Sequence, residues 1–259
     1  MPAARRPSSS PKKKSSSPAQ APRARPAERE EVADETARRL AAAIPEPKSD
    51  LDFADGFQLL VATILSAQSN DKTINRVTPL LFARFPTPRA LAEASAEEVE
   101  DIVRPTGFYR NKAKAIRGMS AALVARHGGD VPRTLEELVE LPGVARKTAN
   151  VVLGSAFGIP SGIVVDTHAG RVSRRLRLTC EEDPGKVERD LCALFPKESW
   201  IDVGHRLVLH GRYVCTAKKP RCAACPLNEV CASREQEPEG PWQERARREA
   251  QVVASRGEA

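Results

Sequence analysis

The chain has 259 residues and is 41% hydrophobic, so it is long enough to bury a sizeable core in one large or two small domains. No apolar run approaches the length of a membrane-spanning helix, and the 4% aromatic content disfavours a sheet-rich fold and a surface of stacked rings. The net charge of +7 comes from residues 1–27, which hold seven of the 41 Lys and Arg and no acid, so the rest is neutral with 34 of each sign.

The basic segment 1–27 is rich in Ser, Pro and Ala, a composition that is typical of disorder. It either holds a polyanion loosely or acts as a solubilising extension, and the sequence leaves both open. No apolar stretch follows its positive charges, so we expect no signal peptide and a reducing, cytosolic setting. The charged segment 234–259 is expected to be a second tail.

Between these tails the sequence predicts one helix after another. One helical stripe repeats at i, i+3, i+4, i+7 and i+8 and comprises Phe57, Leu60, Val61, Ile64 and Leu65. Two later helices begin at the capping boxes of Ser95 with Glu98 and of Thr134 with Glu137. The only strand-like run, Ile163–Val165, has three residues. We therefore predict an all-α fold with short connections.

The segment LPGVARKTA, residues 141–149, predicts a tight hairpin before a helix that runs from Lys147 to about Phe157. Free amides of the hairpin and of the first helical turn point one way, and such a turn binds a phosphate without reading the base sequence. The hairpin residues expected to approach DNA are Gly143, Ala145 and Arg146. An ordinary helix–helix turn is the alternative.

Lys147 lies in the first turn of that helix, where the positive end of the helix dipole disfavours an ammonium and lowers its pKa. The neutral amine is the form that attacks a carbonyl-like carbon, although a solvated surface lysine is the alternative. Asp166 follows the apolar run 163–165, which is expected to carry it to the edge of a core. A carboxylate beside Lys147 would take its proton or stabilise a sugar cation, but the sequence does not place the two together.

Four cysteines stand in the pattern Cys-x6-Cys-x2-Cys-x5-Cys within 17 residues, namely Cys215, Cys222, Cys225 and Cys231. Four thiolates so close together suit one soft metal centre, and a reducing cytosol disfavours disulfides. Zinc sites usually use two short knuckles, and only Cys222 and Cys225 form one, so a [4Fe–4S] cluster is the first interpretation and zinc the alternative. Cys180 and Cys192 are expected to be small, buried apolar residues.

LPGVARKTANVVLGSAFGIP followed by VVDTHAGRVSRRL resembles the helix–hairpin–helix DNA glycosylase superfamily, and the cysteine loop makes the chain similar to its endonuclease III branch. FQLLVATILSAQSND, GFYRNKAKAI and LHGRYVC resemble further landmarks of that branch, so the likeness spans residues 52–231. It implies a six-helix domain at residues 49–159 and an iron–sulfur domain at residues 28–48 and 160–233. DNA would lie in the groove between them.

The resemblance also implies residue roles. Lys147 would attack C1′ of a nucleotide flipped out of the duplex, and the resulting Schiff base would lead to β-elimination on the 3′ side. Asp166 matches the catalytic carboxylate, Gln68 the side chain that fills the gap left by the flipped base, and Phe108 an apolar wedge against the opposite strand. From the residues alone, Gln68 would be a polar surface residue and Phe108 a core residue.

Lys218, Lys219 and Arg221 lie between the first two cluster cysteines, where a structural cluster would present them to a phosphate backbone. The chain departs from the family at the hairpin, where the usual Gly-Val-Gly is Gly-Val-Ala. Ala145 can adopt fewer backbone conformations than glycine, so it would restrict the turn. Phe108 is larger than an aliphatic wedge, which would change opposite-base preference or the cost of extruding a base. The basic tail is not part of the family's common core.

We therefore expect a bifunctional DNA glycosylase and AP lyase of base excision repair that removes oxidised pyrimidines. Its partner would be duplex DNA with a damaged base or abasic site, and it would act as a monomer in the cytoplasm, near the nucleoid and without a membrane. An adenine-mismatch glycosylase shares the cysteine pattern but lacks the lysine nucleophile, so Lys147 disfavours it. A non-enzymatic helix–hairpin–helix module is the other alternative, and binding alone needs neither Lys147 nor Asp166.

Overall fold

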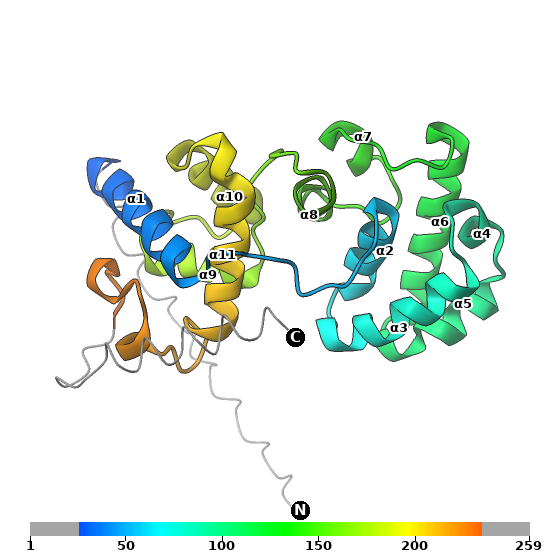
Figure 1. The fold of residues 1–259 in the computed structure, drawn as a ribbon, viewed down its shortest axis with the longest axis horizontal. Coiled ribbons are helices and arrows are strands. Elements are labelled where there is room, and N and C mark those ends of the chain that lie inside the picture. Colours follow the sequence, from blue (N-terminus) through cyan, green and yellow to red (C-terminus); the bar gives the residue numbers. More distant parts are fainter. Residues whose placement is uncertain (1–25, 235–259) are drawn as a thin grey trace, which may run out of the picture.

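The computed structural model describes residues 26–234, and every regular element in that range is a helix (Figure 1). The all-α prediction is confirmed, and the strand-like run at 163–165 is a connection that leads into a helix. Of the two expected tails, residues 1–25 and 235–259 lie outside the described residues.

The α-helices are α1 (Pro26–Ala43), α2 (Gly56–Ser66), α3 (Asp71–Arg84), α4 (Pro88–Glu93), α5 (Ala96–Val103), α6 (Tyr109–His127), α7 (Leu135–Val139), α8 (Arg146–Phe157), α9 (Thr167–Arg175), α10 (Pro184–Leu194) and α11 (Trp200–Tyr213). The 3-10 helices are η1 (Arg104–Thr106), η2 (Lys197–Ser199), η3 (Cys222–Ala224) and η4 (Asn228–Val230).

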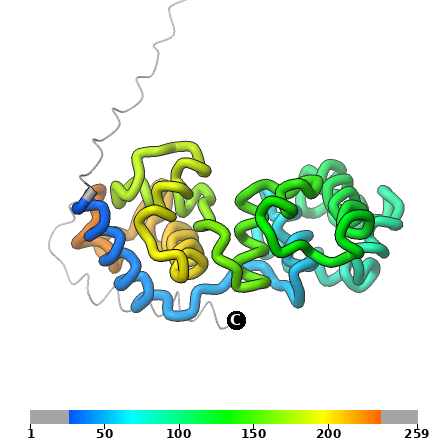
Figure 2. The backbone as a smooth tube through the Cα atoms, turned by 90° about the horizontal axis from the view of Figure 1, so that it is seen from above, coloured from blue at the N-terminus to red at the C-terminus, as the bar shows by residue number. Residues whose placement is uncertain are grey.

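The helices form two lobes, each around its own hydrophobic core (Figure 2). The continuous lobe, residues 51–157, has a core that runs along the chain from Leu51 to Leu153. The split lobe, residues 26–44 and 163–234, has a core that joins Ala33 and Leu40 to residues from the last third of the chain. The first helix therefore packs beside α10 and α11, as Figures 1 and 2 show, and not beside the helix that follows it.

Local signals explain where several helices begin. The five residues of the predicted stripe are all buried on α2. The capping box of Ser95 and Glu98 is confirmed at the start of α5, and Thr134 accepts a hydrogen bond from the Glu137 amide at the start of α7. Seven α-helices fall between residues 56 and 157, one more than the family resemblance implies, because α4 and α7 are separate short helices.

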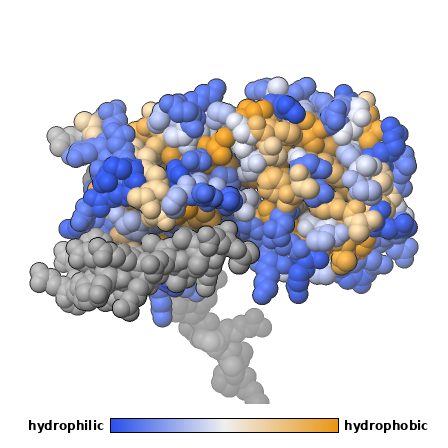
Figure 3. Space-filling view, viewed as in Figure 1, coloured by the Kyte–Doolittle hydropathy of each residue, from blue (hydrophilic) through white to orange (hydrophobic). Residues whose placement is uncertain are grey.

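The two lobes meet through side chains more than through packed helices. Among the described residues, the close helix–helix contacts fall within one lobe or the other. The chain passes between the lobes twice, at 44–55 and at 158–166. In the space-filling view, hydrophobic residues gather on the exposed face of the continuous lobe (Figure 3). No helix in residues 26–234 is long and apolar enough to cross a membrane.

Candidate active site and cysteine loop

The hairpin before α8 is held by one glycine that the backbone requires. Gly143 has φ +78°, and a Cβ built on it would lie 3.0 Å from Ala115 Cβ. Ala145, by contrast, has φ −86° and ψ 164°, a conformation that any residue adopts. The restriction expected from Ala at this position is therefore absent from the backbone. Val144 is buried between them, so the hairpin is anchored in the continuous lobe while α8 begins at Arg146.

Asp166 closes the second connection between the lobes and caps α9. Its Oδ1 accepts hydrogen bonds from the amides of His168 and Ala169, both at 2.8 Å. These bonds satisfy two of the amides that a helix start leaves free, and they fix the orientation of the carboxylate. The apolar run before Asp166 contributes Ile163 and Val165 to the core of the split lobe. The expectation that a core edge would hold Asp166 in place is met.

Lys147 and Asp166 line the same cavity, which lies between the two lobes. Lys147 reaches it as an exposed residue from the first turn of α8 in the continuous lobe, whereas Asp166 belongs to the split lobe. Polar walls come from the 48–51 linker, α2, α3 and α11, and include Asp50, Thr63, Ser66, Asp71, His205 and Arg212. An amine and a carboxylate that the sequence could not place together therefore share one cavity.

Arg212 forms a fixed charged wall of this cavity. Its guanidinium donates to the carboxylates of both Asp50 and Asp71, and the Tyr213 hydroxyl also donates to Asp50 at 3.3 Å. Burial opposes the positive charge, but the two carboxylates together raise the pKa of Arg212. The sequence analysis missed this cluster, although Arg212 lies in the quoted LHGRYVC segment. Its partners are more than 140 residues away, which no local pattern reveals.

His205 is a second wall residue that sequence reasoning missed. A 3.0 Å hydrogen bond joins its Nε2 to Ser155 Oγ on α8, so it links the two lobes. Burial lowers the pKa of His205 below its ordinary value of 6.5, which favours a neutral imidazole at physiological pH. The cavity thus contains one neutral ring and a fixed Arg–carboxylate cluster besides Lys147 and Asp166.

Gln68 and Phe108 share an unusual backbone. In residues 26–234, only three non-glycine residues have positive φ, namely Gln68 (53°), Phe108 (48°) and Arg177 (58°). Such conformations cost about 1–3 kcal/mol and persist where the surroundings enforce them, often at functional sites. Arg177 follows α9 in an ordinary helix-ending turn, since its amide and that of Leu178 bond back to Arg174 and Ser173.

Phe108 is 66% exposed at the start of α6, so the interpretation of Phe108 as a core residue is wrong. The turn that presents it is fixed from below by Lys112, whose buried ammonium donates to the Thr106 carbonyl at 2.7 Å. Gln68 is likewise exposed, in the turn between α2 and α3. Two strained turns therefore hold large side chains out of the continuous lobe.

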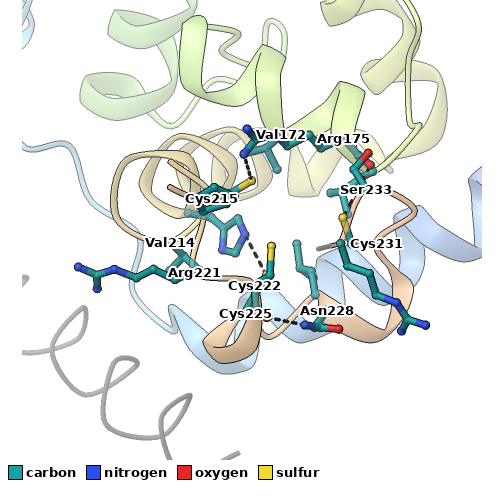
Figure 4. Close-up of a pocket in the computed structure, with 15 residues that line it drawn as sticks. Val172, Arg175, Val214, Cys215, Arg221, Cys222, Cys225, Asn228, Cys231 and Ser233 are labelled. Carbon is teal, nitrogen blue, oxygen red and sulfur yellow. Dashed lines mark hydrogen bonds between the residues drawn. The ribbon is translucent and has the colours of Figure 1, made fainter. Parts of the chain in front are cut away.

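The four patterned cysteines line one pocket of the split lobe. Figure 4 shows the sulfur atoms of Cys215, Cys222 and Cys231 facing a common space, and Cys225 completes the set. All six cysteines are free thiols, so disulfides do not hold this loop. Within residues 26–234, no three His, Cys, Asp or Glu side chains converge closely enough to hold a single ion. A pocket lined by four thiols can hold an iron–sulfur cluster.

Two of these sulfur atoms have nitrogen atoms of basic side chains beside them. Arg175 Nη1 donates to Cys215 Sγ at 3.1 Å, and His210 Nε2 lies 3.5 Å from Cys225 Sγ. Donors at the sulfur atoms are the outer-shell contacts expected around a thiolate cluster. Arg171 ties the helix capped by Asp166 to the same loop, because it donates to the Cys215 carbonyl at 3.0 Å. The loop is therefore connected to the active-site helix.

Lys218, Lys219 and Arg221 are exposed on the loop, and Figure 4 shows Arg221 directed away from the cysteines. Cys180 and Cys192, expected to be small buried apolar residues, are partly buried, and Cys192 packs against the core of the split lobe. Arg146, expected to approach DNA, is exposed and also pairs with Glu188 on α10. Of the remaining predicted positions, Gly143 and Ala145 are exposed in the hairpin.

Comparison with known proteins identifies the family to which this fold belongs. The family model described as HhH-GPD superfamily base excision DNA repair protein matches residues 61–197, and the iron-sulfur binding domain of endonuclease III matches residues 215–231. Endonuclease III of Synechocystis sp. is 50% identical over 73% of this chain and 86% of its own length. Endonuclease III of Escherichia coli K12 is 41% identical over 74% of this chain and 90% of its own length.

Solved structures agree. A trapped covalent intermediate of endonuclease III with DNA, in an estranged-adenine complex, superposes with a TM-score of 0.75 at 38% identity, covering 84% of this chain and 98% of that chain. A thermostable thymine-DNA glycosylase has the same fold, with a TM-score of 0.70 at 18% identity over 80% of this chain and 96% of that one. The chain belongs to the HhH-GPD superfamily of base excision DNA repair proteins and, within it, to the endonuclease III family.

Proposed function

We propose that Lys147 and Asp166 carry out the reaction of this enzyme, which is a bifunctional DNA glycosylase and AP lyase of base excision repair. Its reaction removes oxidised pyrimidines from duplex DNA and cleaves the strand 3′ to the abasic site. The observation that carries the assignment is the shared cavity, into which one lobe brings an amine and the other a carboxylate. Endonuclease III trapped covalently on DNA, the relative with this fold, supports a covalent mechanism.

The proposed chemistry begins with the neutral amine of Lys147. Its nitrogen forms a bond to C1′ of the nucleotide while the bond from C1′ to the base breaks, and the base leaves with the electron pair of that bond. Ring opening of the sugar gives a Schiff base, in which the C2′ proton is acidic. Loss of that proton expels the 3′ phosphate by β-elimination. Asp166, held by two amides, stabilises the positive charge that develops at the sugar and accepts a proton.

The DNA contacts follow from exposure and backbone geometry. Gln68 fills the gap left by the flipped nucleotide and Phe108 wedges against the opposite strand, since both are exposed on strained turns. The hairpin amides around Gly143 and Ala145 bind a phosphate. Lys218, Lys219 and Arg221 add phosphate contacts from the cysteine loop. Phe108 in place of an aliphatic wedge sets the preference for the opposite base.

The enzyme's cofactor is a [4Fe–4S] cluster, and the four cysteine thiolates of the loop are proposed to hold it. When bound, the cluster supplies a rigid crosslink for the loop. The proposed domains are residues 28–48 with 160–233, which carry the cluster, and residues 49–159, which carry the hairpin. Duplex DNA with a damaged base or abasic site is the partner, and the enzyme acts as a monomer in the cytoplasm, near the nucleoid.

Borohydride trapping tests the assignment. Wild type, Lys147→Ala and Lys197→Ala are incubated with a duplex that contains thymine glycol, and Lys197 is a matched exposed lysine outside the cavity. A covalent band in wild type and in Lys197→Ala, but not in Lys147→Ala, is the expected result. A wild-type protein that binds the duplex and gives no band would contradict the lyase mechanism. It would then favour a monofunctional adenine glycosylase or a binding module.

A further inference from the structure

Arg146 immediately precedes Lys147, and although its side chain is 54% exposed it is paired with a carboxylate. Its Nε donates to Glu188 Oε2 at 2.8 Å and its Nη2 donates to Glu188 Oε1 at 3.0 Å, a two-pronged pair with a fixed geometry. The carboxylate raises the pKa of Arg146. Glu188 lies on α10 in the split lobe, so this pair spans the two lobes one residue away from the proposed nucleophile.

Glu188 occupies a site that is shaped around it. Its side chain is only 8% exposed, and Asn150 Nδ2 donates to Oε1 at 2.9 Å. Asn150 is oriented in turn by Ser161, whose hydroxyl donates to Asn150 Oδ1 at 2.8 Å. A Cβ built on Gly162 would lie 2.1 Å from Glu188 Oε1, so the crossover chain leaves room for the carboxylate only because residue 162 has no side chain.

A buried carboxylate costs free energy unless its partners are complete, and removing one partner of such a pair is strongly unfavourable. Here both oxygens are satisfied, and every partner comes from the first two turns of α8 or from the chain that leads to Asp166. The close helix packing of the described residues falls within the lobes. The network is therefore one of few contacts that can set where the start of α8 sits relative to the split lobe.

We propose that Arg146 is a positioning residue, which clamps the first turn of α8 to Glu188 and Asn150 and thereby sets the separation between Lys147 and Asp166. This inference rests on the proposed function of those two residues. It gives Arg146 a role other than the expected phosphate contact, because its Nε and Nη2 donate to Glu188. Arg212, which lines the cavity, pairs with the carboxylates of Asp50 and Asp71 and so makes a second charged contact between the lobes.

The test compares the cluster-loaded enzyme as wild type, Arg146→Met, Glu188→Gln and the double variant. Glu181→Gln is the matched control, because it removes an ion pair with Lys186 that lies wholly within the split lobe. Two quantities are measured for each protein. The first is the single-turnover rate of borohydride-trapped complex on an abasic-site duplex, and the second is the Kd for a duplex with a tetrahydrofuran abasic analogue, which cannot form a Schiff base.

A clamp predicts that Arg146→Met and Glu188→Gln each slow trapping by about 10- to 100-fold, the loss expected from a misplacement of about 1 Å, while Kd changes less than about threefold. The double variant should be no slower than the slower single variant, because both remove the same contact. The control should trap at the wild-type rate. The double variant leaves no lone buried charge, so it decides the question if a single variant fails to fold or to hold its cluster.

Two outcomes would overturn the clamp. A phosphate-binding Arg146 predicts that Arg146→Met weakens the Kd and reduces its salt dependence by about one ion, while Glu188→Gln frees the guanidinium and tightens binding. Wild-type trapping rates in the folded double variant would show that the pair does not position Lys147. Failure of the proposed function is distinguishable from both, since wild type itself would then give no trapped complex.

Discussion

The two lobes reach stability by different routes. The continuous lobe is one stretch of chain around a core that includes fully buried residues from nearly all of its helices. The split lobe joins two stretches that are far apart in sequence, and part of its core is made by Cys225 and Leu227 of the cysteine loop. One lobe can therefore fold from local packing, whereas the other needs segments that are far apart in the sequence. Because the lobes share the active-site cavity, activity depends on the less self-sufficient one.

The largest effect on stability should come from a variant that cannot bind the iron–sulfur cluster. Cys222→Ala is expected to abolish the visible absorption of the cluster and to expose the amides of α1, α9 and α11 to hydrogen exchange, because the loop loses a ligand. The amides of α2 and α6 should stay protected, since their core contains no loop residue. Cys192→Ala is the control and should keep the colour. Equal loss of protection in both lobes would contradict the claim that only the split lobe depends on the cysteine loop.

A second test asks whether the split lobe contributes chemistry or only shape. Asp166→Asn keeps an oxygen that can cap α9, so the fold should be retained, but it removes the charge facing the sugar. Turnover should fall by about 10²- to 10⁴-fold, the range of a lost acid–base group. Asp183→Asn is a matched control, because Asp183 caps α10 through the Lys186 amide at 3.0 Å and lies outside the cavity. Similar losses in both variants would mean that capping, not chemistry, explains the effect.

Relieving a strained turn of the continuous lobe should have a smaller effect, which raises stability and lowers the trapping rate. Phe108→Gly should stabilise the protein by about 1 kcal/mol, because glycine adopts positive φ without strain, and should slow trapping on lesion-containing duplex by about tenfold. Arg177→Gly relieves the same strain at φ 58° in the split lobe and should leave trapping unchanged. Thermal unfolding and single-turnover trapping measure the two effects. A destabilised Phe108→Gly would show that the exposed ring packs usefully in the free enzyme.

The smallest effect concerns the contact between the lobes at His205. Since burial lowers its pKa below 6.5, the unfolded chain takes up a proton before the folded one does as pH falls. Stability is therefore full above pH 6.5 and declines below it until the folded-state pKa is reached. Burial also lowers the pKa of His210, to about 4, so that residue adds to the same decline. His205→Gln should make the stability measured by urea unfolding less dependent on pH between 7 and 5. An unchanged dependence would show that His205 does not contribute to it.

Sequence patterns predicted what is local. The stripe on α2 and the Ser95 cap depend on neighbours within a few residues, and both are confirmed. The bonds between the lobes were not predictable, because Arg146 and Glu188 are 42 residues apart and neither belongs to a periodic pattern. The exposure of Phe108 was also not predicted from its residue type, because its hydrophobicity favours burial. The positive φ at this residue directs the side chain outward instead. For the cysteines, spacing left zinc open, and the match of residues 215–231 to the iron-sulfur binding domain of endonuclease III resolved the choice.

The position of α1 has a consequence for how the protein is made. Arg29 and Arg39 of this helix donate to the carbonyls of Leu178 and Pro226, which lie 149 and 187 residues further along the chain. At a synthesis rate of about 5–20 residues per second, the helix emerges on the order of ten seconds before its last partner exists. The continuous lobe has its whole sequence once residue 157 has been made, whereas the apolar face of α1 still waits for the core residues from the last third of the chain. During synthesis the split lobe is therefore the last part of the enzyme that can close.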